Sequence, residues 1–304
     1  MSEVTKKKWK KAFHDALKAF CDSLTKHVST DTGEWTIKGF IDVFRNVYTI
    51  SSDTKIISKI LEIHLFPLIL KFAEDQGFKV VPAEKQNWYP DLTFISKENE
   101  SIKFALDIKT TYRKDGETAG FTLGSHGKYF IDRSSDKNIQ FPYSEYLGHY
   151  CIGIVYTRVE TEAEDSVIAV KDLDSQALKE ARKKVGPRKV TQVDNLKSIV
   201  SVIKDFDFFV AEKWKIASDK RGSGNTANIG SISDLDQLKA ENGPFSVLGE
   251  QMFDEYWMNY DKVSRIVNGR KQNIRDIESF LKFRKEMELL KKLKAWRERK
   301  AKKK

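Results

Sequence analysis

The sequence has little cysteine and no long apolar segment. Its two cysteines, Cys21 and Cys151, lie far apart in a chain of 304 residues. Such a pair supplies neither a disulfide framework nor the cysteine ligands of a zinc site, which favours a reducing compartment. The longest apolar stretch, Ile63 to Leu70, is short and contains a histidine and a proline. We therefore expect no membrane span and, because the Lys-rich start lacks an apolar core, no export signal.

Histidine is also sparse. The five histidines show no metal-ligand spacing and have no serine or cysteine nucleophile as a partner. We expect all of them to be packing or surface residues: His14, His27, His64, His126 and His149.

The positive charge lies at the two ends of the chain. The formal net charge is +10, yet residues 282–304 carry twelve Lys or Arg against three Glu, and residues 1–11 carry five Lys against one Glu. The middle of the chain is therefore slightly acidic. Basic ends of this kind suit a polyanion, most often nucleic acid. A solvated helix whose lysines only confer solubility fits the tail equally well.

Hydrophobic periodicity predicts a globular α/β (α+β) protein with a mixed sheet flanked by helices. Helical patterns cover 8–27, 53–77 with Asp53 as the N-cap and a kink at Pro67, about 250–261, and 273 into the tail. Short apolar runs predict strands at 78–81, 92–95, 102–108, 151–156, 206–210 and 214–217. The charged segment 160–204 reads as partly helical and exposed.

The most specific local pattern is a Pro-Asp pair followed by Asp-x-Lys. Asp91 starts one predicted strand, and Asp107 and Lys109 lie two residues apart on the next. Because side chains alternate along a strand, Asp107 and Lys109 share a face, and Asp91 can face Asp107 across the sheet. Two carboxylates form an oxygen site suited to Mg²⁺, and a lysine can stabilise charge or help to deprotonate a water. Phosphodiester hydrolysis requires these groups.

The same spacing also arises by chance, because short motifs carry a high false-positive risk. Two surface carboxylates in a salt bridge with a lysine satisfy it as well. The spacing alone therefore favours a structural ion pair over a nuclease centre.

Longer strings change this balance. Five of them occur in one order along the chain: KQNWYPD at 85–91, ALDIKTTY at 105–112, FTLG at 121–124, VYTRV at 155–159 and GSGNTANIGS at 222–231. Together they resemble the EcoRV family of type II restriction endonucleases, in the PD-(D/E)xK superfamily. The likeness runs from about residue 52 to about residue 260, roughly two thirds of the chain. It implies a restriction-endonuclease-like fold.

The resemblance also implies a homodimeric, Mg²⁺-dependent enzyme that cuts both strands of double-stranded DNA at a short palindrome. Asp91 and Asp107 would be metal ligands, Lys109 the catalytic lysine, and Glu62 a further catalytic carboxylate and metal ligand from the preceding helix. Taken alone, Glu62 would be an exposed helix carboxylate. Lys55 would lie near the scissile phosphate. A cognate DNA methyltransferase and a place in the cytoplasm of a prokaryotic cell are implied as well.

By the same resemblance, three groups of residues would contact DNA. The residues that match the family's major-groove loop are Gly222, Ser223, Gly224, Asn225, Thr226 and Asn228. Those that match its minor-groove loop are Lys85, Gln86 and Asn87, and those that match its contacts with the DNA backbone are Thr110, Thr111 and Tyr112. Asn225 would pair with adenine, and the Thr226 methyl group would touch a thymine methyl group.

Because Asn225 and Thr226 are intact, the resemblance implies the target GATATC, cut bluntly at its flexible central TA step. Three positions depart from the family sequence: Lys85 stands for Gln, Trp88 for His and Ala227 for Thr. The glycine-rich stretch also fits a dinucleotide-binding fingerprint, but no apolar helix follows it. A plain surface loop is the other interpretation.

The expected organisation has three parts: an N-terminal helical and dimerisation region over 1–50, a catalytic and DNA-recognition domain over 51–265, and a basic helical tail over 266–304. Two other functions stay open. One is a non-catalytic, sequence-specific DNA-binding protein, against which the retained Asp91, Asp107 and Lys109 argue. The other is a repair or structure-specific nuclease of the same superfamily.

Overall fold

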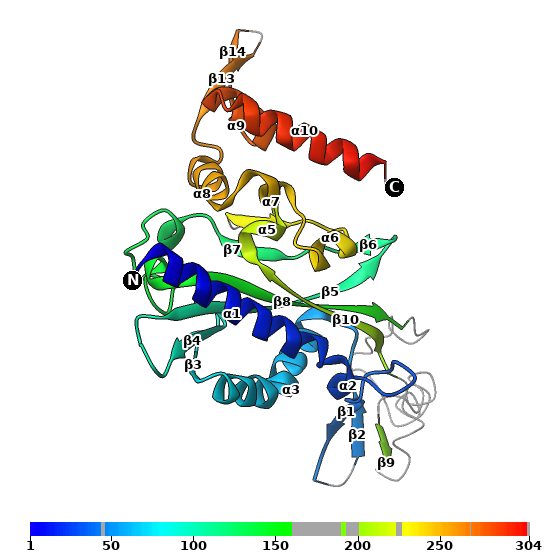
Figure 1. Cartoon of the computed structure of the whole chain (residues 1–304). Helices are drawn as coiled ribbons and strands as arrows, with labels where there is room; N and C mark the ends of the chain where they lie inside the picture. Colours follow the sequence, from blue (N-terminus) through cyan, green and yellow to red (C-terminus); the bar gives the residue numbers. More distant parts are fainter. Residues whose placement is uncertain (44–45, 160–189, 193–200, 223–226, 268, 303–304) are drawn as a thin grey trace. The chain divides into compact units, whose positions relative to one another are not determined.

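A computed structural model describes residues 1–43, 46–159, 190–192, 201–222, 227–267 and 269–302 (Figure 1). The chain forms two compact units. The first contains Met1–Asp22, Leu68–Ile154 and Phe208–Lys304, and the second contains Ser23–Pro67 and Val155–Asp207. The three consecutive parts expected from the sequence stay a prediction. Three long elements begin in one unit and end in the other: α3 (Thr54–Asp75), β8 (Tyr146–Arg158) and β10 (Ile203–Glu212).

The central sheet has the strand order β10-β8-β5-β4-β3. Its remaining strands are β3 (Phe78–Pro82), β4 (Leu92–Ser96), β5 (Lys103–Lys114) and the short β6 (Glu117–Thr118), which pairs with β5. β4 is antiparallel to both β3 and β5. All five residues of β4 are buried, as expected for a strand with both faces covered. The predicted α/β class and the five strand predictions between 78 and 210 are confirmed.

An aromatic cluster joins α1 (Glu3–Asp22) to this sheet within the first unit. Figure 1 shows the course of the helix, in blue, along the sheet. Phe13 is 2% exposed. Its ring stacks on Phe104 of β5 at 4.1 Å and meets the edges of Phe78 and Phe94 at 5.3 Å. Aromatic pairs at such distances add to the free energy gained by burying their area. The apolar stripe of the predicted first helix therefore faces the sheet.

The helix boundaries follow local chemistry. Asp53 caps α3 as predicted, since its Oδ1 accepts hydrogen bonds from the backbone N–H groups of Lys55 and Ile56 at 2.9 and 3.2 Å. The single helix predicted over 8–27 is wrong at its end. α1 stops at Asp22, and a separate turn, α2, covers Thr25–Val28. Asp22 and Ser23 lie at this break. The side chains of Asp and Ser can bond to nearby backbone groups, and they then compete with the backbone hydrogen bonds of the helix.

A second sheet of three strands lies in the first unit, in the order β11-β12-β7. Its strands are β7 (Thr122–Ser125), β11 (Ala217–Arg221) and β12 (Asn228–Ser231), and two short 3-10 turns, Lys128–Phe130 and Tyr143–Glu145, follow β7. The strand predicted over 214–217 is wrong. A helical turn, α5 (Lys213–Ile216), precedes β11. Short apolar runs do not distinguish strand from helix by periodicity.

The C-terminal part is helical apart from one hairpin. Its elements are α6 (Leu235–Lys239), α7 (Pro244–Leu248), α8 (Glu250–Asn259), β13 (Ser264–Val267), β14 (Arg270–Asn273), α9 (Ile277–Arg284) and α10 (Met287–Ala301). The continuous helix predicted from 273 onward is wrong. α9 ends where Lys285 adopts a positive φ of 61°, a conformation that a helix cannot continue through.

α10 is a docked helix (Figure 1). Its residues Leu290, Leu293 and Trp296 are buried at helical spacing, and the Trp296 indole N–H donates to Asn242 Oδ1 at 3.1 Å. The Lys and Arg side chains of α10 itself are exposed or partly exposed. Removing the tail would therefore expose a core as well as remove charge.

The second unit contains a three-stranded sheet formed by β1 (Gly39–Ile41), β2 (Asn46–Thr49) and β9 (Val190–Gln192). Most of the segment 160–204 lies outside the described residues, and so does its predicted helical content. None of the helices in the described ranges combines the length and apolar character that a bilayer crossing requires.

Candidate catalytic site and DNA-binding surface

Two neighbouring antiparallel strands bring Asp91 and Asp107 together. Leu92 pairs with Leu106 across β4 and β5, so the residues just beyond this pair face each other. The Asp91 backbone N–H donates to Asp107 Oδ1 at 3.2 Å, and the Ile108 N–H donates to Asp91 Oδ2 at 2.8 Å. Each carboxylate is thus held by the backbone of the opposite strand.

Lys109 lies between the two carboxylates. Its Nζ is 3.0 Å from Asp107 Oδ2 and 3.8 Å from Asp91 Oδ2. Burial alone would lower the pKa of Lys109, but the charges of Asp107 and Asp91 outweigh it and hold the pKa well above its ordinary value. The ammonium group is therefore charged at neutral pH, so in this arrangement Lys109 acts as a cation.

The donor set fits a divalent cation. Asp91 and Asp107 present hard oxygen ligands at one point, and they already hold the positive charge of Lys109 there. The Asp107 side chain is 7% exposed, whereas that of Asp91 is 36% exposed, so the site opens on the Asp91 side. Mg²⁺ commonly binds one or two carboxylates together with water and a substrate phosphate.

Glu62 and Lys55 lie on α3 in the second unit. Glu62 Oε2 accepts a hydrogen bond from Lys59 at 2.7 Å, and its side chain is 32% exposed. Lys55 is exposed near the capped start of the helix. Their parts in catalysis stay predictions.

The loop between β3 and β4 carries the predicted minor-groove residues. Lys85, Gln86 and Asn87 are all exposed, as contact with a ligand requires. The Lys85 ammonium group lies 4.9 Å from the Trp88 ring centroid, a cation–π distance. Lys85 and Trp88 therefore interact with each other.

The predicted backbone contacts on β5 differ in exposure. Thr110 and Tyr112 are partly exposed. Thr111 is 2% exposed, and its hydroxyl donates to the Gly120 carbonyl at 3.2 Å. The structure thus places the Thr111 side chain inside the fold and not on a surface where it could reach DNA.

The predicted recognition loop starts from a defined hairpin base. The Gly222 N–H donates to the Asn228 carbonyl at 3.0 Å, where β11 and β12 end and begin. A Cβ on Gly222 would lie 2.5 Å from Thr122 Cγ2, so a larger residue at this position would require the Thr122 side chain to move. Asn228 is partly exposed. Ser223, Gly224, Asn225 and Thr226 lie outside the described residues.

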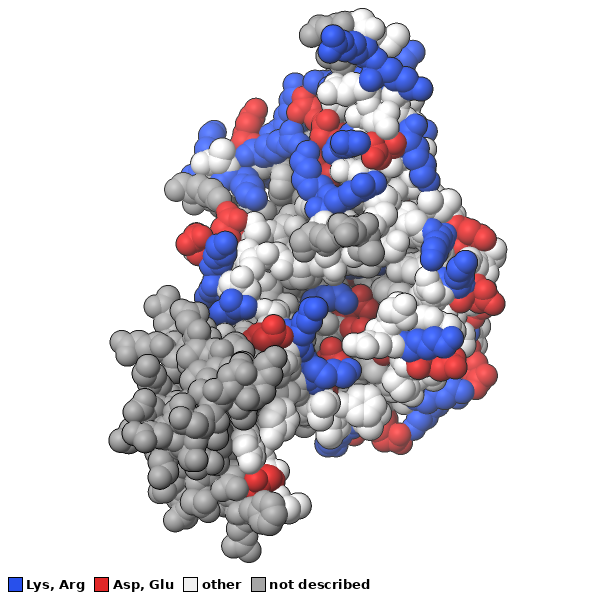
Figure 2. Space-filling model, turned by 180° about the vertical axis from the view of Figure 1, so that it is seen from behind, with Lys and Arg blue, Asp and Glu red and all other residues white. Residues whose placement is uncertain are grey.

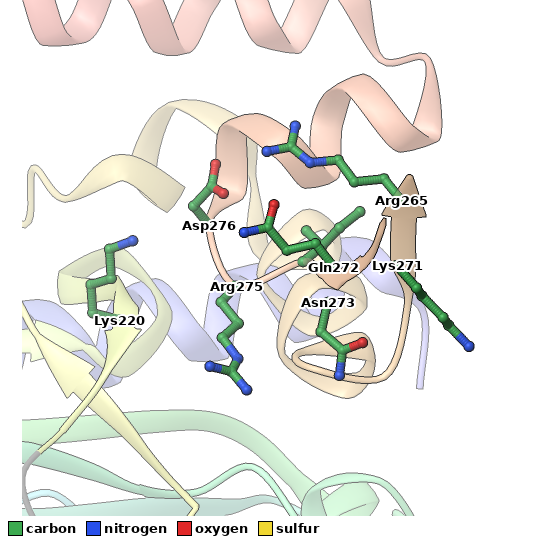
Figure 3. A pocket seen from close by; sticks show the side chains of 8 residues that line it. Lys220, Arg265, Lys271, Gln272, Asn273, Arg275 and Asp276 are labelled. Atoms are coloured by element: carbon green, nitrogen blue, oxygen red, sulfur yellow. The ribbon is translucent and has the colours of Figure 1, made fainter. Parts of the chain in front are cut away.

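A basic groove of about 420 Å³ lies beside this hairpin base (Figure 3). Lys220 of β11 and Arg265 of β13 line it, together with Lys271, Gln272, Asn273, Ile274, Arg275 and Asp276. Arg275 pairs with Asp261 at 2.7 Å, and the Asp276 carboxylate caps α9. None of Lys220, Arg265 and Lys271 has a carboxylate within salt-bridge distance among the described residues, although Asp276 lies near enough to interact with the charges of Lys220 and Arg265. Lys and Arg gather over this upper part of the first unit in Figure 2.

Our sequence analysis missed this groove, although a signal was present. Residues 262–275 contain five Lys or Arg and no Asp or Glu. Counting charge only at the two ends of the chain hid this cluster. A basic groove of this kind attracts phosphate through electrostatics that do not depend on base sequence.

A second cluster was also missed, because its members are distant in sequence. Ligand atoms of His14, Glu212 and Glu241 lie within 4.8 Å of one another. The same carboxylates already pair with lysines, however. Lys215 lies 2.7 Å from Glu212 and 3.3 Å from Glu241, and Lys10 lies 3.3 Å from Glu212. We interpret the cluster as an ion-pair network that ties α1 to the segments after β10.

Comparison with known proteins identifies the family of this chain. A model of the family described as restriction endonuclease EcoRV matches residues 31–285, which leaves α10 outside the match. The type II restriction enzyme EcoRV of Escherichia coli is 34% identical over 250 residues, which cover 82% of this chain and 91% of that enzyme. The chain therefore belongs to the EcoRV family of restriction endonucleases, and it is a type II site-specific deoxyribonuclease.

Proposed function

We propose that this endonuclease cuts GATATC bluntly in a Mg²⁺-dependent reaction. The observation that carries the proposal is the facing pair Asp91 and Asp107 with the Lys109 ammonium group 3.0 Å from Asp107. Members of the family generally depend on a divalent metal. A bound Mg²⁺ would neutralise the scissile phosphate and lower the pKa of its water.

The chain's own residues have separate parts in this proposal. Asp91 and Asp107 would hold the metal, with Glu62 as an additional ligand. Lys109 would stay protonated and stabilise the charge that develops on the phosphate. Lys55 would lie near the scissile phosphate. The exposed Lys85, Gln86 and Asn87 would follow the minor groove, and Thr110 and Tyr112 the backbone.

The proposed target rests on the loop closed by Gly222 and Asn228. Within that loop, Asn225 would read adenine and Thr226 would touch thymine. The cation–π pair of Lys85 and Trp88 lies in the predicted minor-groove loop between β3 and β4. A changed preference for the DNA sequence would arise there.

The direct test is cleavage of a plasmid that carries one GATATC site, followed by sequencing of the cut ends. We expect one linear product with blunt ends in Mg²⁺ and none in EDTA. A different consensus among the cut ends of a digested phage genome would reject the target and keep the nuclease. Binding of DNA without any cut would favour a non-catalytic binding protein, and cuts without a palindrome would favour a repair nuclease.

We further propose that the enzyme works as a homodimer in the cytoplasm of a prokaryotic cell, alongside a methyltransferase that protects the host's sites. The support for the homodimer is an apolar surface on the β1–β2 hairpin, within the expected dimerisation region 1–50. Phe40, Ile41 and Val43 are 55%, 61% and 90% exposed. Neighbouring exposed apolar side chains of this kind mark association surfaces.

Replacing Ile41 and Val43 by aspartate should weaken the dimer at least tenfold. The reason is that two charges would be buried without partners at the interface. Sedimentation equilibrium measures the effect, with the parent at twice the 35.1 kDa chain mass. The matched control is aspartate at exposed Ile266, in the first unit. An unchanged dimer constant in the double variant would place the interface elsewhere.

Neutralising the basic groove should reduce the salt dependence of DNA binding. In the variant with Lys220→Gln, Arg265→Gln and Lys271→Gln, three fewer phosphates would be contacted. The slope of log K against log salt should then fall by about 2–3. Fluorescence anisotropy of a labelled duplex measures this slope.

Two further variants serve as controls for the salt dependence of the groove variant. Lys71, Lys79 and Lys97 are each paired with a neighbouring carboxylate, so changing these three to glutamine removes the same charge and should leave the slope nearly unchanged. Changing the exposed Lys292, Lys294 and Arg299 of α10 tests the basic tail without removing its buried residues. Equal slopes for the groove variant and the parent would show that the groove does not contact DNA.

A further inference from the structure

The strand that leads into the predicted recognition loop contains a bulge. The pairs on either side of this bulge are Ala217 with Ser231 and Arg221 with Ile229. Three residues of β11 therefore stand opposite one residue of β12, Gly230, and a Cβ there would lie 2.7 Å from the Lys220 carbonyl oxygen. A bulge interrupts the hydrogen-bond ladder and bends its strand. The pairing with β12 alone therefore does not fix the direction in which β11 reaches Gly222.

Asp219, in the middle of the bulge, is held from outside the sheet. β11 is the edge strand in the order β11-β12-β7, so its outer polar groups require other partners. The Asp219 carbonyl oxygen accepts a 2.7 Å hydrogen bond from the Tyr256 hydroxyl of α8. Its side-chain Oδ2 accepts from the Ile277 N–H of α9 at 3.2 Å and lies 4.0 Å from Arg297 Nη2 of α10. Three helices thus meet at one residue of the strand, and we call these contacts the Asp219 anchor.

The anchor is shielded from water. Tyr256 is 0% exposed, and the Asp219 side chain is 17% exposed. Hydrogen bonds and ion pairs of a carboxylate are stronger where little water competes for them. Arg297 also donates to Glu278 Oε2 of α9 at 2.8 Å, so its guanidinium group links α9 to Asp219. The helix α10, which lies outside the family match, thereby takes part in holding β11.

The anchor lies close to the base of the predicted recognition loop. Gly222 follows Asp219 by three residues, and its N–H bond to the Asn228 carbonyl closes the base of the loop. Contacts with base edges need well-aligned hydrogen bonds of about 2.7–3.2 Å. Attraction to phosphates falls off slowly with distance and carries no sequence information. Loosening the anchor should therefore reduce discrimination between DNA sequences more than it reduces binding to DNA.

We propose that Asp219 is a positioning residue for DNA recognition, through which α8, α9 and α10 fix the direction in which β11 enters the recognition loop. The inference rests on the proposed DNA contacts of that loop. Asp219 itself touches neither a base nor a phosphate in this proposal. Because Arg297 belongs to the anchor, α10 has a part in sequence discrimination that is separate from its positive charge.

The test is the ratio of single-turnover cleavage rates on the target and on duplexes that differ from it by one base pair. The target is the consensus read from the parent's own cut ends, so a consensus other than GATATC leaves the test intact. Asp219→Ala should lower this ratio about tenfold or more, the order of one lost base contact. Tyr256→Phe removes only the hydroxyl of a buried ring and should lower the ratio as well.

Asp234→Ala is the matched control. The Asp234 carboxylate accepts a hydrogen bond from the Gln237 N–H at 3.1 Å in the first turn of α6, so this variant loses a similar bond without touching the anchor. Its ratio should equal that of the parent. Arg297→Gln should lower the ratio less than Asp219→Ala does, because the distance of 4.0 Å makes its contact the weakest of the three. An unchanged ratio in Arg297→Gln would remove α10 from the proposal.

The outcomes separate the possible failures. All variants are compared at a temperature where circular dichroism shows them to be folded. If Asp219→Ala does not fold, Tyr256→Phe carries the test, because it keeps the buried ring. A parent-like ratio in the variant that carries the test, or an equal fall in Asp234→Ala, would overturn the role of Asp219. A parent that cuts without any consensus would instead overturn the proposed sequence recognition, and this inference with it.

Discussion

Asp107→Ala is expected to reduce the rate of DNA cleavage by at least about 10³-fold while DNA binding persists. The variant removes a carboxylate that faces Asp91 and holds Lys109 at 3.0 Å. A metal that polarises a phosphate contributes several kcal/mol to transition-state stabilisation, and each 1.4 kcal/mol or so is a factor of ten. Single-turnover cleavage of a GATATC duplex at saturating enzyme measures the effect on the chemical step.

Two controls define this result. Asp107→Asn keeps an oxygen that can accept from the Asp91 N–H, so it should preserve the fold and still fail to cut. Glu145→Ala removes a carboxylate that pairs with Lys103 at the surface, and it should cut like the parent. If Asp107→Ala cleaves at the parent's rate, the catalytic centre lies elsewhere.

Phe13→Ala is expected to lower the free energy of unfolding by about 3–5 kcal/mol, the usual cost of deleting a buried aromatic ring. Phe13 is 2% exposed and lies against Phe104 and Tyr150 as well as Phe78 and Phe94. Its loss would leave a cavity between α1 and the central sheet. Urea unfolding followed by far-ultraviolet circular dichroism measures the change.

Phe283→Ala is the matched comparison, because Phe283 is 48% exposed. Its effect should stay within about 0.5 kcal/mol, as for other surface substitutions. A similar small change in Phe13→Ala would mean that the helix does not depend on this cluster. If Phe13→Ala stayed folded but cleaved DNA much more slowly than the parent, the result would instead show that α1 helps to set the geometry of β5.

Local patterns predicted the elements that bear the proposed catalytic residues Asp91, Asp107 and Lys109. The short apolar runs 92–95 and 102–108 correspond to β4 and β5, and Asp53 marks the start of α3 through its side-chain oxygen. These signals are local, because a strand's faces and a helix's cap depend on residues within a few positions. They failed at 214–217 and at 273–286, where a helical turn and a break at Lys285 depend on packing that short apolar runs do not encode.

The sequence by itself determined the family and the Asp91, Asp107 and Lys109 pattern, because those residues lie on β5 or directly before β4 and within long matching strings. Only the tertiary structure showed that Thr111 is inside the fold, that Lys220 meets the 265–276 segment in a basic groove, and that Lys213 is buried against the Tyr89 ring. Each of these features joins residues that are distant along the chain or hides a polar side chain. Burial and long-range charge are set by the packing of whole elements, and no local pattern reports them.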